Sequence, residues 1–130
     1  MFVMLKKIAI FGEAEKGMFQ QPYLCESLSK LFDNLGNPVE KSSSIAFAIQ
    51  SLLSHYGIVY FRVHEEGFSK KDYMKGLQYL EESNEHMPLS LITIFGVGDK
   101  EIITAARKAC KSHNCYMLIQ EKDLYDYYTH

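Results

Sequence analysis

The sequence predicts an α/β fold, a single-domain open and mainly parallel four-stranded sheet with helices on both faces. The chain has 130 residues, which is close to the commonest size of one domain. After Pro88, residues 89–95 are apolar or β-branched except for Ser90, which is typical of a strand buried on both faces. Similar short apolar runs alternate with helical patterns along the chain, so we expect strands that return through helices and run parallel.

The composition favours an ordinary globular protein, with 47% hydrophobic and 23% charged residues. The net charge is -2 and arginine occurs only at Arg62 and Arg107, so we expect no nucleic-acid partner. No apolar run has the length that a membrane span needs, and the amino terminus is apolar before its lysines, the reverse of a signal peptide. Three cysteines without framework spacing favour the cytoplasm.

The first half of the chain predicts one strand followed by two helices. The strand covers 5–12, and a polar loop follows it. Pro22 suits the first turn of a helix, and leucines at helical spacing continue to Gly36. Ser43 or Ser44 is expected to cap a second helix that ends at Gly57. A helical pair over about 22–57 is therefore predicted between the first two strands.

The second half predicts three more strands and three more helices. The second strand is expected over 58–64, and Ser69 with Asp72 partly matches the start of a capped helix. Asp99 follows the third strand and is the expected cap of the next helix. The fourth strand is expected over 115–120, with a short final helix from Glu121.

Right-handed crossovers between these strands predict a Rossmann-like or flavodoxin-like three-layer sandwich. The sequence does not give the strand order. We expect the first strand near the centre of the sheet, where a reversal of strand order opens a crevice.

Each predicted strand ends in a loop that begins with carboxylates or glycine, and these four loops are expected at one edge of the sheet. Carboxylates placed there are suited to holding Mg²⁺, acting as a general base, or binding a polyol or amine. The alternative is that acidic residues at helix amino ends only complement the helix dipole. The candidate catalytic residues are Glu13, Glu15, His64, Glu65, Glu66 and Asp99. The candidate ligand-binding residues, which shape the backbone, are Gly12, Gly17, Gly96 and Gly98.

Two glycine patterns resemble phosphate-binding motifs without completing them. Gly12 and Gly17 have the gap of a Walker loop, but Met18 and Phe19 stand where Lys and Ser or Thr are required. Residues 96–99 open like a dinucleotide fingerprint and lack its third glycine, so a tight turn before a capped helix is the better interpretation.

Histidine and cysteine offer weaker candidates. His64 stands beside Glu65 at a strand end, where a His–carboxylate pair can act as acid and base, although a lone polar strand end is the alternative. Cys110, His113 and Cys115 have no second Cys/His pair to complete a tetrahedral site, so these three residues are not predicted to bind a metal. Cys25 is expected to be a buried thiol.

The acidic pair Glu13 and Glu15 after the first strand resembles that of response-regulator receivers. That family requires an aspartate at the end of the third strand, where this chain has Phe95 and Gly96, and a lysine at the end of a fifth strand that the sequence does not show. The resemblance therefore assigns no function.

The sequence leads to one functional hypothesis and one alternative. The first is a small cytoplasmic protein with a small-molecule or metal-assisted site at the carboxyl ends of the strands, its cofactor and its reaction left open. The alternative is a non-catalytic adaptor that forms a homodimer or docks a protein partner through Tyr125, Tyr127 and Tyr128, because tyrosine is favoured at interfaces.

Overall fold

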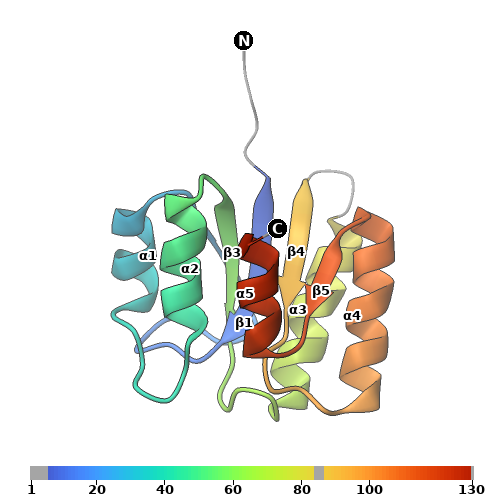
Figure 1. The fold of residues 1–130 in the computed structure, drawn as a ribbon. Coiled ribbons are helices and arrows are strands. Elements are labelled where there is room, and N and C mark those ends of the chain that lie inside the picture. Colours follow the sequence, from blue (N-terminus) through green and yellow to red (C-terminus); the bar gives the residue numbers. More distant parts are fainter. Residues whose placement is uncertain (1–5, 84–86, 130) are drawn as a thin grey trace.

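The computed structural model describes residues 6–83 and 87–129, and this part of the chain forms an α/β fold with a five-stranded mixed sheet and five helices (Figure 1). Of the described helices, none combines the length and the apolar character that a membrane span requires. The elements in chain order are β1 (Lys7–Gly12), β2 (Pro22–Cys25), α1 (Leu28–Leu35), α2 (Ser44–Leu53), β3 (Gly57–Arg62), α3 (Lys70–Glu82), β4 (Leu89–Thr93), α4 (Lys100–His113), β5 (Tyr116–Leu118) and α5 (Glu121–Thr129).

The strand order is β2-β3-β1-β4-β5. β1 pairs in parallel with β3 and β4, and β4 pairs in parallel with β5. These are the four predicted strands, and the first of them lies at the centre as expected. The sheet is nevertheless mixed rather than four-stranded, because β2 joins its edge antiparallel to β3.

β2 corrects the prediction of a helix beginning at Pro22. Proline donates no backbone hydrogen bond and is therefore tolerated in an edge strand, which is the place of β2. α1 begins only at Leu28, where the Ser27 hydroxyl accepts a hydrogen bond from the Lys30 backbone N–H at 3.2 Å. The helical pair thus covers 28–53, and the helical spacing of Leu24 with the later leucines is coincidental.

β1 divides the core into two clusters because its side chains alternate between the faces of the sheet. Ile8 and Ile10 pack with residues of α1, α2 and α5. Ala9 and Phe11 pack with residues of α3 and α4 on the other face. All six residues of β1 are buried, so the loop that follows this strand leaves from the centre of the sheet.

Gly76 of α3 lies directly against two aromatic side chains of the sheet. Phe11 and Phe61 stack there with ring centroids 4.7 Å apart. A Cβ on Gly76 would lie 2.9 Å from Phe11 Cζ and from Phe61 Cδ1. The two phenylalanines therefore require glycine at this position.

We expect Gly76→Ala to destabilise the protein by about 1–3 kcal/mol, because overpacking outweighs the better helix propensity of alanine. Urea unfolding measures the change. Gly98→Ala is the matched control, since a Cβ on Gly98 meets nothing within 4 Å. Equal stability of the two variants would contradict this packing.

Candidate functional site

Glu13 and Glu66 join the loops after β1 and β3. The Glu13 backbone N–H donates to Glu66 Oε1 at 3.2 Å, and the Glu66 N–H donates to Glu13 Oε2 at 3.0 Å. Glu66 Oε1 also accepts hydrogen bonds from the hydroxyls of Ser42 at 2.7 Å and Ser44 at 2.8 Å. Two of the predicted carboxylates are thus brought together, and both bind groups of the chain itself. We call this arrangement the glutamate latch.

Two buried tyrosines hydrogen-bond to the backbone beside the glutamate latch. The Tyr60 hydroxyl donates to the Glu13 carbonyl at 2.8 Å, and the Tyr73 hydroxyl accepts from the Gly67 N–H at 2.6 Å. Burial, followed by the negative charge of Glu66, raises the pKa of Tyr60 well above its ordinary value. The Tyr60 hydroxyl therefore stays protonated and remains a donor.

The loop after β3 closes the crevice that the reversal of strand order would open. A Cβ on Gly67 would lie 2.6 Å from the carbonyl oxygen of Gly96, so the loops after β3 and β4 touch. Both glycines have positive φ, +91° and +77°, which other residues rarely adopt. Because β1 lies between β3 and β4, this contact covers the end of β1.

Three predicted site residues lie apart from the glutamate latch. Glu15 Oε1 accepts the Asn37 N–H at 2.7 Å, beyond the end of α1. Asp99 Oδ1 caps α4 by accepting the N–H groups of Glu101 at 2.8 Å and Ile102 at 3.2 Å. Glu65 is exposed. The Asp99 contacts match the helix-cap alternative that the sequence left open, whereas Glu15 lies at the carboxyl end of α1 and does not. A catalytic role for these residues stays a prediction.

The other predicted glycines also serve the backbone. Gly12 is buried, and a Cβ there would lie 2.7 Å from the Tyr60 hydroxyl. Gly17 has a φ of +110°, and its carbonyl accepts a hydrogen bond from Arg62 Nη1 at 2.7 Å. Gly98 is exposed. A ligand-binding role for the four glycines stays a prediction.

His64 pairs with Asp72, not with Glu65. Its Nδ1 lies 2.8 Å from Asp72 Oδ2, and its backbone N–H donates to the same oxygen at 2.9 Å. Gln20 Nε2 donates to Asp72 Oδ1 at 3.0 Å. The His64 side chain is 62% exposed and that of Asp72 only 3%. A buried carboxylate thus holds an exposed imidazole at the carboxyl end of β3.

The hydrogen bonds to Asp72 fix its charge state. Burial raises the pKa of this carboxyl, but the His64 ring, the His64 backbone N–H and Gln20 together outweigh that effect and hold the pKa below its ordinary value. An ionised carboxylate only accepts hydrogen bonds, so Nδ1 of neutral His64 is the donor. Nε2 of His64 is then the nitrogen that can accept a proton.

Aromatic stacking also positions His64. The Phe19 ring stacks on the His64 ring with centroids 3.4 Å apart and planes 12° apart. The guanidinium carbon of Arg62 lies 4.4 Å from the centroid of the same phenylalanine ring. Gln20, next in the chain, has a φ of +62°, a left-handed conformation that is uncommon for a residue other than glycine.

A groove of about 570 Å³ begins at Gln20, the residue that also binds Asp72. This volume lies within the ordinary range of small-molecule sites, about 300–1,000 Å³. Lys71 and Lys75 give the groove positive charge. Its lining consists of Gln20, Lys71, Met74, Lys75 and Gln78.

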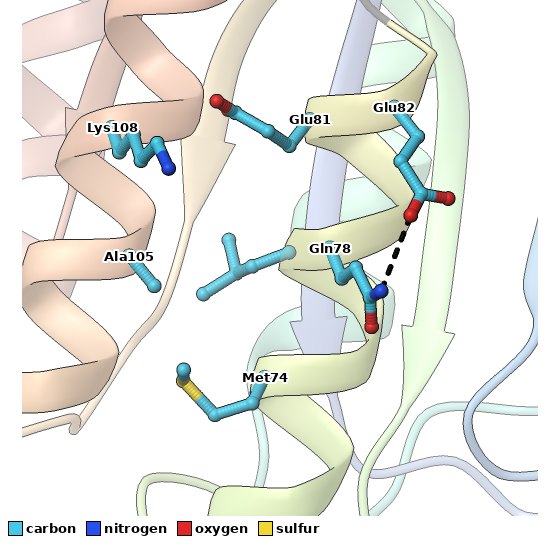
Figure 2. Close-up of a pocket in the computed structure, with 7 residues that line it drawn as sticks. Met74, Gln78, Glu81, Glu82, Ala105 and Lys108 are labelled. Atoms are coloured by element: carbon cyan, nitrogen blue, oxygen red, sulfur yellow. Dashed lines mark hydrogen bonds between the residues drawn. The ribbon is translucent and has the colours of Figure 1, made fainter.

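A second groove, of about 260 Å³, lies between α3 and α4. Figure 2 shows Met74 of α3 and Ala105 of α4 pointing toward each other across it. Gln78 Nε2 donates to Glu82 Oε1 at 3.2 Å on its rim. None of its lining residues is a predicted site residue, and it shares Met74 and Gln78 with the first groove.

Within residues 6–83 and 87–129, no three His, Cys, Asp or Glu side chains gather as a potential metal site. His113, considered as a ligand from the sequence, lies with Nδ1 3.1 Å from the Met87 carbonyl and Nε2 2.6 Å from the Leu80 carbonyl. Both ring nitrogens therefore face backbone oxygens.

The tyrosines of α5 contact the chain's own core. The Tyr128 hydroxyl lies 2.7 Å from Ser51 Oγ, and the Tyr127 hydroxyl lies 3.1 Å from Ser90 Oγ. Burial raises the pKa of Tyr127 to about 12. Tyr125 is 73% exposed. Tyr127 and Tyr128 are thus engaged within the chain. The predicted role of the three tyrosines in a dimer or partner contact stays untested.

Comparisons with known protein families, with curated proteins and with solved structures find no match for this chain. The candidate site therefore stands on geometry alone.

Sequence reasoning missed Asp72 and Gln20. Asp72 falls in the first turn of α3, so its pattern favours a helix cap. The sequence signal that could have revealed the pairing of Asp72 with His64 is the βα connection itself. The end of a strand and the first turn of the next helix lie close together when the loop between them is short. Gln20 lies 52 residues from Asp72 in the chain and gives no comparable signal.

We expect Glu66→Ala to destabilise the protein by about 2 kcal/mol, because the Glu13 N–H and two serine hydroxyls lose a charged acceptor. Glu65→Ala removes an exposed neighbouring carboxylate and should change stability by less than about 0.5 kcal/mol. Thermal or urea unfolding compares the two. Equal losses would refute the glutamate latch.

The lowered pKa of Asp72 makes the free energy of unfolding fall at acid pH. Because its folded-state pKa lies below the unfolded value of about 3.9, its contribution is full above that value and is lost as the pH falls through the folded-state pKa. The stability gap between the natural protein and Asp72→Asn should therefore persist as the pH falls from 7 to about 5 and shrink below about pH 4. Urea unfolding at a series of pH values measures the gap, with the exposed Asp33→Asn as control. A gap that stays constant down to pH 3 would contradict the pairing.

Proposed function

We propose that this chain binds an anionic small molecule beside His64 and transfers a proton to or from it. His64 is the general acid or base, and Asp72 is a positioning residue. The observation that carries the proposal is the 2.8 Å contact between Nδ1 of the exposed His64 and Oδ2 of the buried Asp72. A general base must be accessible and correctly oriented, and this pair supplies both properties.

The chemistry follows from the two nitrogens of the His64 ring. Nδ1 donates to the carboxylate, so Nε2 can take a proton from a water molecule or from a substrate hydroxyl. The imidazolium that forms is stabilised by the negative charge of Asp72, whose pKa lies below its ordinary value. The proton then returns from Nε2 to a leaving group, and His64 is neutral again.

The groove beside the pair supports the choice of an anion. Gln20 binds Asp72 and also lines the groove, which Lys71 and Lys75 make positive. Arg62, against Phe19, adds a third cation close to His64. These residues suit a phosphate or carboxylate group, whereas the carboxylates of the glutamate latch already accept hydrogen bonds from the chain.

We also infer the finer features of the fold and the compartment. The strand order and the two core clusters support the three-layer arrangement expected of a Rossmann-like or flavodoxin-like domain. The free thiols of Cys25, Cys110 and Cys115 support a cytoplasmic protein.

The reactivity of His64 tests the proposal without a known substrate. Diethyl pyrocarbonate acylates unprotonated imidazole nitrogens, and mass spectrometry of the peptides locates the product. At pH 7 we expect His64 to react at least about tenfold faster than His55, which is exposed on the turn after α2. Asp72→Asn should remove most of this advantage. If His64 reacts no faster than His55, the proposed acid–base role fails.

Anion binding is tested separately by NMR titration with inorganic phosphate and with acetate. We expect phosphate to shift the signals of His64 and Gln20, and Lys71→Glu with Lys75→Glu to weaken this effect by about tenfold or more. Lys111→Glu, on exposed α4 surface, is the matched charge control. Shifts that are unaffected by the first pair of changes would exclude the groove as the anion site.

A further inference from the structure

Two of the three cysteines meet where α4 ends. α4 closes with Asn114 in the left-handed conformation, at φ 53° and ψ 50°. The Asn114 N–H donates to the Lys111 carbonyl at 3.2 Å, and the Cys115 N–H donates to the Cys110 carbonyl at 3.0 Å. These two bonds define a Schellman motif, in which the side chains of the first and last residues contact each other. In the sequence from Cys110 to Cys115, those two residues are both cysteines.

The two thiols interact directly. The interaction with the neighbouring Cys115 side chain, together with burial, raises the pKa of Cys110, and the interaction with Cys110 lowers the pKa of Cys115. Cys110 Sγ also lies 3.5 Å from the Tyr116 carbonyl, an acceptor that favours the protonated form of Cys110. Cys110 is 8% exposed, whereas Cys115 is half-buried and open to solvent on one side.

We propose that Cys110 and Cys115 form a redox-active dithiol, which a small-molecule disulfide oxidises to an intramolecular disulfide bond. The backbone hydrogen bond between the same two residues keeps their Cα atoms within the reach of a disulfide. Both are free thiols in this structure. The dithiol lies at the amino end of β5, the opposite edge of the sheet from His64, so it is independent of the proposed acid–base site.

The exchange has two steps. The Cys115 thiolate attacks one sulfur of the disulfide, a mixed disulfide forms, and the other half leaves as a thiolate that takes a proton from solvent. Cys110 then gives its proton to solvent, its sulfur attacks Cys115 Sγ, and the second half leaves as a thiolate that takes a proton from solvent. The protein loses two protons and two electrons, and the small-molecule disulfide is reduced to two thiols.

The structure assigns different roles to the two cysteines. Cys115 is the more accessible of the two and its pKa is lowered, so its thiolate attacks the small-molecule disulfide first. Cys110 is the resolving thiol, because it touches Cys115 from the core side. Cys25 has no such partner among the cysteines, lies buried in the other cluster, and has a pKa raised by burial, so it should react slowly.

The test treats the full chain with oxidised glutathione and then alkylates the thiols that remain free. Mass spectrometry of the protein and of its peptides identifies the products. We expect an intramolecular disulfide between Cys110 and Cys115 that forms at least about tenfold faster than Cys25 is modified. In the Cys110→Ser variant the reaction should stop at the mixed disulfide between glutathione and Cys115. Cys115→Ser should react no faster than Cys25, and Cys25→Ser, the matched control, should behave as the natural protein.

Two results would overturn the dithiol proposal. One is a natural protein that retains glutathione on Cys115 without forming the intramolecular bond. The other is a pair that remains fully open to alkylation after exposure to oxidised glutathione. Both are read on the unmodified sequence, so the test does not depend on the folding of a variant.

Discussion

The parallel pairing of β1 with β3 and β4 is the constraint on which the rest of the structure depends. It places three chain reversals at one edge of the sheet, and the polar backbone groups of those loops need partners there. Glu13 and Glu66 supply these partners by accepting each other's N–H groups. The same carboxylates that suggest a binding site from the sequence thus bind groups of the chain at the centre of that edge. At its flank the exposed His64 is held by the buried Asp72.

His64 and Asp72 form this flank. β2 and the loop that leads to it bring Phe19 and Gln20 against the end of β3, which the antiparallel edge strand makes possible. Phe19 stacks on the imidazole, and Gln20 completes the hydrogen bonding of the buried carboxylate. The edge strand that the sequence did not predict is therefore next to the segment that builds the candidate site.

The sequence predicts features that depend on local patterns. The strand after Pro88 and the cap at Asp99 follow from hydrophobic runs and from residues close in the chain, and the structure confirms them. Cys25 is buried as predicted, but it lies in β2 and not on the helix face from which its burial was inferred. β2 was missed because four residues with one proline have too little pattern to outweigh the leucine spacing around them. The His64–Asp72 pair was missed because Asp72 has the sequence signature of a helix cap. The contact of Cys110 with Cys115 requires a left-handed Asn114, which the sequence permits without demanding it.

The central claim is that Asp72 holds His64 with Nδ1 as the donor, and the ¹⁵N chemical shifts of the His64 ring measure this directly. At a pH where His64 is neutral, the account predicts a protonated Nδ1 and an unprotonated Nε2, and a loss of this preference in Asp72→Asn. A neutral His64 that carries its proton on Nε2, or that is unchanged by Asp72→Asn, would contradict it.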